Sequence, residues 1–141
     1  MLGLSFGGNS VELREVLLLG AHCDDIEIGC GGTVLELARR YPGLKVHWVV
    51  FSSDEGRGRE AEAAAEAFLA GFAQPDIRIA SFRNAFFPYI GAEIKDYFER
   101  LKAEISEECY TSGMILYGTT HRVGDGITTA AIIAPEHQAD A

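Results

Sequence analysis

The residues best suited to chemistry lie in one short segment, Gly20–Glu27, directly after a run of apolar residues. Burying its histidine and three acids is costly unless they are paired or bind a cation; these residues are His22, Asp24, Asp25 and Glu27. Imidazole and carboxylate groups together are typical ligands of a divalent metal, zinc above all. One of two adjacent carboxylates can bind the metal while the other accepts a proton from water. On spacing alone, the alternative is a solvated acidic loop in which His22 has only a capping role.

A glycine-rich stretch, Gly29–Gly32, follows the acidic segment and is expected to open a helix. Glycines let the backbone come close to a ligand or to a sheet, and a helix N-terminus favours anions. The spacing differs from G-x-G-x-x-G and does not follow the strand directly, so it is a poor match to a dinucleotide site. Close packing of the helix is the alternative to phosphate binding.

The elements that must position these residues follow from apolar periodicity, which predicts four strands alternating with three helices. The expected strands cover residues 16–19, 45–51, 77–80 and 114–117, and the expected helices cover 33–40, 57–69 and 90–106. Short continuous apolar runs are typical of strands covered on both faces. The order predicts an α/β fold, a Rossmann-like open parallel sheet with helices on both faces in three layers. Ligands of such sheets bind beyond the carboxyl ends of the strands, where His22 lies.

The net charge of the chain argues against some classes of binding partner. The chain has 141 residues and a formal net charge of −9, from 12 Lys and Arg against 21 Asp and Glu. A field of this sign repels phosphate backbones and anionic lipids, so we expect no nucleic-acid partner and no membrane-surface partner. A small sugar or nucleotide held in a local site stays compatible with this charge.

The organisation along the chain predicts one domain in a cytoplasmic protein. We expect an irregular N-terminal arm over residues 1–14, an α/β domain over 15–126 and an atypical C-terminal tail over 127–141. No apolar stretch is long enough to span a bilayer, and the first residues lack a signal-peptide pattern. Three cysteines at no zinc-finger spacing make a disulfide framework improbable. The oligomeric state stays open, and an exposed sheet edge would favour association.

The segment Ala21–Glu27 followed by Gly29–Thr33 resembles the signature of the PIG-L/LmbE-type zinc-dependent N-acetyl-sugar deacetylases. Cys23 stands where that family usually has proline. Arg57 and Glu60, which come after the second strand, resemble the same family, as does the aromatic stretch 86–89. The likeness runs from about Val16 to about Arg122, which is most of the chain.

This resemblance implies a hydrolase that uses Zn²⁺ to remove acetyl groups from N-acetylglucosamine-type sugars or their conjugates. It implies that His22 and Asp25 bind zinc and that Asp24 is the general base. Arg57 would lie on the substrate side of the site, with Glu60 orienting it. For the last two residues, the alternative is a solvated ion pair at the start of a helix.

The third ligand of the family is a histidine in a His-x-Asp-His-like segment after the fourth strand, whose first histidine is taken to help stabilise the tetrahedral intermediate. Residues 118–126 occupy that place here and contain no paired histidine. His121 is the candidate third ligand and His137 the other remaining donor, since His47 inside the second strand is expected to be a core histidine. We therefore expect a truncated or frameshifted copy that binds zinc weakly and deacetylates slowly or not at all. The alternative is a natural short form whose site is completed by His121, by solvent or by a partner chain.

A Mg²⁺-binding receiver-like signalling domain is the alternative function, because such domains also place an acidic pair after the first strand. They need an acceptor aspartate and a lysine after later strands. Here residues 77–81 end without an acid, and the last lysine, Lys102, lies inside a predicted helix. A Rossmann nucleotide binder is a third option, disfavoured by the glycine positions. Zinc-dependent acetate release from an N-acetylhexosamine separates the deacetylase from the receiver, which acetyl phosphate would label.

Overall fold

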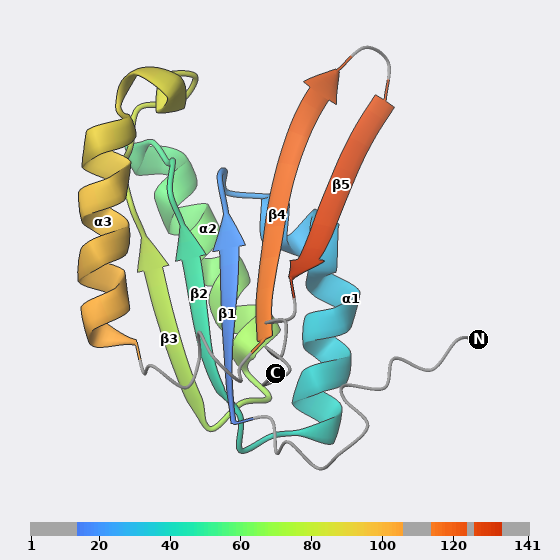
Figure 1. Cartoon of the computed structure of the whole chain (residues 1–141). Helices are drawn as coiled ribbons and strands as arrows, with labels where there is room; N and C mark the ends of the chain where they lie inside the picture. Colours follow the sequence, from blue (N-terminus) through green and yellow to red (C-terminus); the bar gives the residue numbers. More distant parts are fainter. Residues whose placement is uncertain (1–13, 106–113, 124–125, 134–141) are drawn as a thin grey trace, which may run out of the picture.

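A five-stranded sheet forms the centre of the chain, in the order β3-β2-β1-β4-β5 (Figure 1). The computed structural model describes the backbone of residues 14–105, 114–123 and 126–133, and the side chains of residues 14–105 except Glu55. The strands are β1 (Glu15–Gly20), β2 (Lys45–Val50), β3 (Gln74–Ile79), β4 (Met114–Val123) and β5 (Gly126–Ile133). The first four strands are parallel, while β5 pairs antiparallel with β4.

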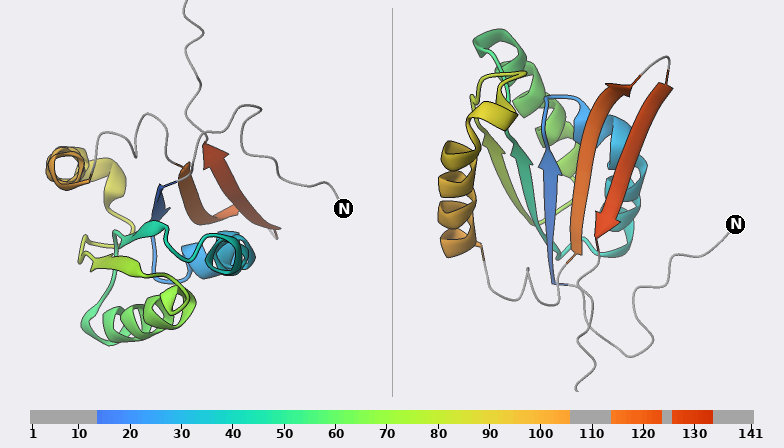
Figure 2. Two further views of the ribbon diagram at one scale, coloured as in Figure 1. Left: turned by 90° about the horizontal axis from the view of Figure 1, so that it is seen from below. Right: turned by 45° about the horizontal axis from the view of Figure 1, so that its top comes forward.

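Helices cover both faces of this sheet, which confirms the three-layer α/β architecture. They are α1 (Asp25–Arg40), α2 (Glu55–Leu69) and α3 (Gly91–Glu104), with a short 3₁₀ helix, η1 (Phe87–Tyr89), before α3. Figure 2 shows α1 and α2 against one face and α3 against the other. All four parallel strands point the same way, so their carboxyl ends form the upper edge of the sheet in Figure 1.

Alternation of side chains along the buried strands divides the core into two clusters. On the α1 and α2 face, β1 and β2 contribute Val16, Leu18, Val46, Trp48 and Val50, which contact Ile26, Val34, Ala65 and Leu69 from the helices. On the α3 face, the buried members are Leu17, Leu19, Val49, Phe51, Leu101 and Ile105. Because β1 is buried along its whole length, the residues that follow it leave the core at a fixed position.

The glycine-rich stretch does not open the first helix, and that expectation is wrong. Helix α1 begins at Asp25, so the glycines lie inside it. A Cβ on Gly31 would stand only 2.9 Å from the Phe68 ring of α2, so Gly31 lets two helices approach closely. This close packing outweighs the low helix propensity of glycine, which costs about 1 kcal/mol per residue. The segment Asp25–Glu27 is consequently the first turn of a helix.

Strand β5 covers residues to which the sequence analysis assigned no element. Its bounds, Gly126–Ile133, fall mostly within the expected C-terminal tail. Residues 1–13, Cys109 and His137 lie outside the described part of the chain. Cys23 and Cys30 are buried free thiols. No helix among the described residues is both long and apolar enough to cross a bilayer.

Candidate metal and active site

The turn that follows β1 is held against β2 by main-chain hydrogen bonds. The amide of Phe51 donates to the carbonyl of Gly20 at 2.9 Å, and the amide of Ser52 donates to that of Ala21, also at 2.9 Å. A Cβ on Gly20 would lie 3.0 Å from Cγ1 of Ile26, so the chain turns tightly into α1. The turn therefore has one defined path at the carboxyl edge of the sheet.

His22 and Asp25 face each other across this turn. Asp25 is fully buried, and its Oδ2 accepts a hydrogen bond from the backbone amide of His22 at 2.9 Å. The same Oδ2 lies 3.5 Å from Nδ1 of His22, whose side chain is 27% exposed. The solvated acidic loop is thus not what the structure shows for Asp25. A buried carboxylate and a partly exposed imidazole share one small region.

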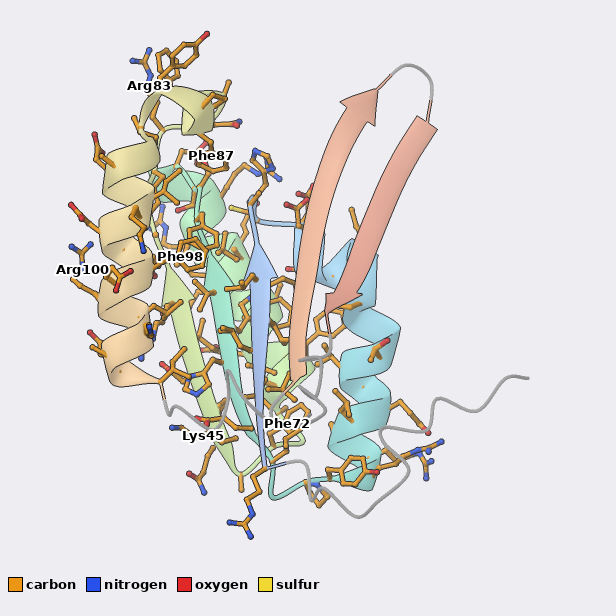
Figure 3. The ribbon with its side chains drawn as sticks, viewed as in Figure 1. Lys45, Phe72, Arg83, Phe87, Phe98 and Arg100 are labelled. Atoms are coloured by element: carbon orange, nitrogen blue, oxygen red, sulfur yellow. The ribbon has the colours of Figure 1, made fainter. Side chains whose placement is uncertain are left out.

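The loop between β3 and α3 supplies contacts to His22 that the sequence analysis did not identify. Oδ1 of Asn84 lies 2.9 Å from Nε2 of His22. The Phe87 ring stacks on the imidazole with centroids 5.9 Å apart and an interplanar angle of 26°. Figure 3 shows Phe87 near the carboxyl edge of the strands, with Arg83 further out on the same loop. The aromatic composition of this loop was noted in the sequence, but nothing there linked Asn84 to a histidine 62 positions away.

Asp24 lies next to the pair but points to a different partner. It occupies the N-cap position of α1 and makes no side-chain capping bond there. Its Oδ2 lies 3.6 Å from Nη2 of Arg57, and about half of each side chain is exposed. An ion pair of this kind is worth at most about 1 kcal/mol, so Asp24 stays free to exchange it for water or a ligand.

Arg57 sits in the first turn of α2, directly after β2. Its backbone amide donates to Oδ1 of Asp54, the N-cap residue, at 2.8 Å. The expected orienting role of Glu60 has no counterpart in the described contacts: Arg57 pairs with Asp24, and both Arg57 and Glu60 are exposed. Because residues three apart lie on one helix face, Glu60 is nevertheless on the same side of α2 as Arg57.

Burial raises the pKa values of two further groups near the turn. Burial raises the pKa of Glu27, and its Oε2 is buried with no hydrogen-bond partner among the described residues. Burial also raises the pKa of the Cys23 thiol, which donates to the carbonyl of Ser52 at 3.3 Å. Cys23 is therefore a packed neutral thiol beside the site, at the position where the resembling family usually has proline.

The donor chemistry and spacing of His22 and Asp25 fit two positions of a zinc site. Ligand atoms about 2.0–2.2 Å from one tetrahedral ion lie about 3.3–3.6 Å apart, which includes the observed 3.5 Å. Within the residues that the structure describes, no group of three or more His, Cys, Asp or Glu side chains could hold a metal ion. A site with three protein ligands would need a further donor beyond His22 and Asp25.

His121, the candidate third ligand, lies in β4, where the structure describes only the backbone. The last residue pair between β1 and β4 is Gly20 with Gly118, and β4 continues for several residues beyond it. His22 follows Gly20 by two residues and His121 follows Gly118 by three. His22, in the turn after β1, and His121, in the neighbouring β4, therefore both follow the last residue pair between these strands.

The other described histidine, His47, belongs to a different part of the sheet. It is buried on the α3 face of β2, with Nε2 at 2.7 Å from Glu15 Oε1 and Nδ1 at 2.6 Å from Asp76 Oδ2. The expectation of a core histidine is confirmed. The two acids that hold it come from β1 and β3, and the sequence analysis did not identify them.

The comparisons with known proteins are sparse. The sequence matches no family model and no curated protein. Among solved structures, the chain is similar to an N,N'-diacetylchitobiose deacetylase from Pyrococcus horikoshii, solved with an inhibitor, at 26% identity and a TM-score of 0.49. The match covers 64% of this chain and 38% of that one. A likeness of this size does not by itself assign an activity.

Proposed function

We propose that the chain has a deacetylase-like hydrolase site at the carboxyl edge of β1, acting on N-acetylated sugars or their conjugates. The observation that carries the proposal is the 3.5 Å approach of His22 Nδ1 to Asp25 Oδ2, with the half-exposed Asp24 beside them. The resemblance of Ala21–Thr33 to the PIG-L/LmbE-type signature supports the same interpretation. We propose Zn²⁺ as the cofactor, with His121 as the third ligand.

Metal binding and proton transfer are assigned to different residues of the candidate site. His22 and Asp25 would hold the ion, which when bound supplies Lewis-acid activation of water and of the amide carbonyl. A carboxylate of Asp24 accepts the proton from the attacking water and returns it to the leaving amine. This is amide hydrolysis, in which the amide C–N bond breaks and acetate and a free amine form.

Arg57 and Glu60 are proposed as substrate-side residues. The Arg57 side chain is 54% exposed and reaches Asp24 from the start of α2, so the remaining guanidinium N–H groups can donate to hydroxyl groups of a sugar. Glu60 on the same side of the helix supplies hydrogen-bond acceptors. No described contact favours the receiver-like alternative, since β3 is followed by Ala80 and Ser81 and by no acid.

Acetate release from N-acetylglucosamine and N,N'-diacetylchitobiose, with and without added zinc, tests the activity. In line with the expected weak zinc binding, we expect slow zinc-dependent release, and Asp24→Asn should lower its kcat by about 10²–10⁴-fold while zinc affinity stays unchanged. Asp96→Asn, which changes an exposed acid on α3, is the matched control and should leave kcat unchanged. Labelling by acetyl phosphate with no acetate release would contradict the proposal.

The third ligand is tested separately by zinc affinity, measured by competition with a chromophoric chelator. His121→Ala should weaken zinc binding as much as His22→Ala does. His137→Ala removes the other histidine outside the described side chains and should have no effect. Equal affinity of His121→Ala and the unaltered chain would contradict the assignment of His121.

A further inference from the structure

Two side chains of the loop between β3 and α3 hold the His22 ring. Asn84 Oδ1 lies at hydrogen-bond distance, 2.9 Å, from Nε2 of His22. The Phe87 ring stacks on one face of the imidazole, with the two ring centroids 5.9 Å apart. The opposite ring nitrogen, Nδ1, faces Asp25. The imidazole is thus contacted by this loop at one nitrogen and one face, and by α1 at the other nitrogen.

The chemistry of these contacts determines where the imidazole proton lies. An amide oxygen can only accept a hydrogen bond, so Nε2 must donate to Asn84 Oδ1. A neutral imidazole has a single N–H, which leaves a lone pair on Nδ1. That lone pair faces Asp25 Oδ2, another acceptor, at 3.5 Å, which is beyond ordinary hydrogen-bond length.

We infer that Asn84 is a positioning residue that fixes His22 in the tautomer with the proton on Nε2 and so directs the Nδ1 lone pair toward Asp25. Ligand histidines commonly donate their second ring nitrogen to a neighbouring acceptor, which fixes both tautomer and orientation. The purpose of this arrangement, holding a metal ion, rests on the proposed function. The tautomer itself does not.

The backbone of the loop holds Asn84 in a defined turn. Residues 83–86 form a turn in which the Phe86 amide donates to the Arg83 carbonyl at 3.3 Å. The third residue of the turn, Ala85, has a φ of 61°, in the left-handed region that favours glycine. Alanine in this conformation is strained, and strain of this kind concentrates at functional sites. The strained residue directly follows Asn84.

The outer side of the same turn is anchored as well. The Arg83 guanidinium carbon lies 3.5 Å from the centroid of the Phe86 ring, a cation–π contact. The Tyr89 amide also donates to the Phe86 carbonyl at 2.7 Å, which begins η1 and carries Phe87 inward. One short turn therefore places Asn84 and Phe87 on the same imidazole.

The test is the tautomer of His22, read from its side-chain ¹⁵N shifts in metal-free protein at about pH 8, where an ordinary histidine is neutral. We expect the Nε2–H form to dominate in the unaltered chain. Asn84→Ala should change the ratio of the two tautomers by about 2- to 12-fold, the range of one ordinary hydrogen bond, toward Nδ1–H donating to Asp25. Asn84→Asp keeps an acceptor at this position and should keep the Nε2–H form.

The remaining histidines separate positioning from misfolding. The signals of His47, which lies away from the loop between two acids, should be the same in all three proteins. A dominant Nδ1–H form in the unaltered chain would mean that Asn84 donates through its amide nitrogen, and would overturn the inference. An unchanged ratio in Asn84→Ala would overturn it too.

A zinc titration of the same samples distinguishes the failure of this inference from that of the proposed function. With both correct, Asn84→Ala weakens zinc binding by about 10- to 100-fold, as loss of an outer partner of a ligand histidine does. If no variant binds zinc while the tautomer changes as expected, the proposed function fails and the positioning role of Asn84 holds. If zinc binds but the tautomer is independent of Asn84, the positioning role fails and the metal site holds.

Discussion

His22 and His47 are both next to carboxylates, yet their surroundings differ. His47 is 1% exposed, and both ring nitrogens lie within 2.7 Å of carboxylate oxygens, from Glu15 and Asp76. His22 is 27% exposed, and the carboxylate of Asp25 lies 3.5 Å from its ring. Both ring nitrogens of His47 are therefore paired within the fold. At His22, the contact of Nδ1 with Asp25 is longer than an ordinary hydrogen bond.

This difference shows how to separate a structural histidine from a candidate ligand. Buried polar groups must be satisfied, and the network around His47 continues from Asp76 to Arg78 and on to Glu104. That network stabilises the packing of β1, β2, β3 and α3. At His22, by contrast, the surrounding loop orients the ring but leaves Nδ1 and a buried carboxylate facing each other, an arrangement that a cation would stabilise.

Removing His47 should have the largest effect on stability. His47→Ala removes the imidazole that links Glu15, which is 8% exposed and also pairs with Lys45, to Asp76. Loss of one member of a buried charged network costs about 3–5 kcal/mol, which denaturant unfolding would measure. His22→Ala is the matched control and should cost less than about 1 kcal/mol, since its ring is partly exposed. Equal losses would remove the distinction between the two histidines.

The carboxylates next to the two histidines should differ in zinc affinity. Asp25→Asn removes a proposed ligand. Zinc affinity should therefore fall by more than about 100-fold, the upper range for losing a residue that only hydrogen-bonds to a ligand. Asp76→Asn makes the same chemical change beside His47 and should leave zinc affinity as it is. Chelator competition measures both. A loss of affinity in Asp76→Asn equal to that in Asp25→Asn would contradict the proposed location of the site.

Acid unfolding should measure how much Asp76, in the network around His47, contributes to stability. Burial acts to raise the pKa of Asp76, but hydrogen bonds from Arg78 and His47 outweigh it, so the pKa is held below the ordinary value of 3.8. A carboxyl group with a lowered folded-state pKa contributes stability above its unfolded pKa, and this contribution is lost as the pH falls through the folded pKa. The free energy of unfolding should therefore fall below about pH 4, and less steeply in Asp76→Asn. Equal slopes would contradict the role of Asp76.

Two glycines of α1 provide the smallest expected effect and test how the helix that carries Asp25 is positioned. Gly31→Ala places a Cβ 2.9 Å from the Phe68 ring and should destabilise the fold by about 1–3 kcal/mol. Gly32→Ala meets nothing within 4 Å and should stabilise it by about 0.5–1 kcal/mol through helix propensity. Thermal unfolding of the pair measures both signs. Stabilisation by both substitutions would mean that α1 is not held closely against α2.

The four parallel strands, the helices and the position of the candidate site were predictable from the sequence because they depend on local patterns, whereas the antiparallel β5 was not predicted. The apolar run before Gly20 predicts a buried parallel strand, and ligand sites follow such strands. The start of α1 was not predictable in the same way. The low helix propensity of its glycines predicts that no helix continues through them. The close packing of Gly31 against Phe68, which overrides this propensity, exists only in the folded chain.

The residues around each histidine depend on strand register and loop conformation, which sequence patterns do not contain. Asn84 reaches His22 through a turn with a left-handed alanine, a conformation that no local signal predicts. Glu15 and Asp76 meet His47 only because three strands pair in a particular register. Figure 3 shows Lys45, the neighbour of Glu15, at the opposite edge of the sheet from Phe87. The surroundings of the two histidines thus lie toward opposite ends of the strands.

The most direct test of the account follows the ¹⁵N signals of all four histidines during a zinc titration of the unaltered chain. The account predicts that Nδ1 of His22 shifts strongly toward the value of a metal-bound nitrogen, that His121 changes with it, and that His47 keeps its signals throughout. Saturating zinc that leaves His22 unchanged, or that acts on His47 instead, would contradict a metal site at the end of β1.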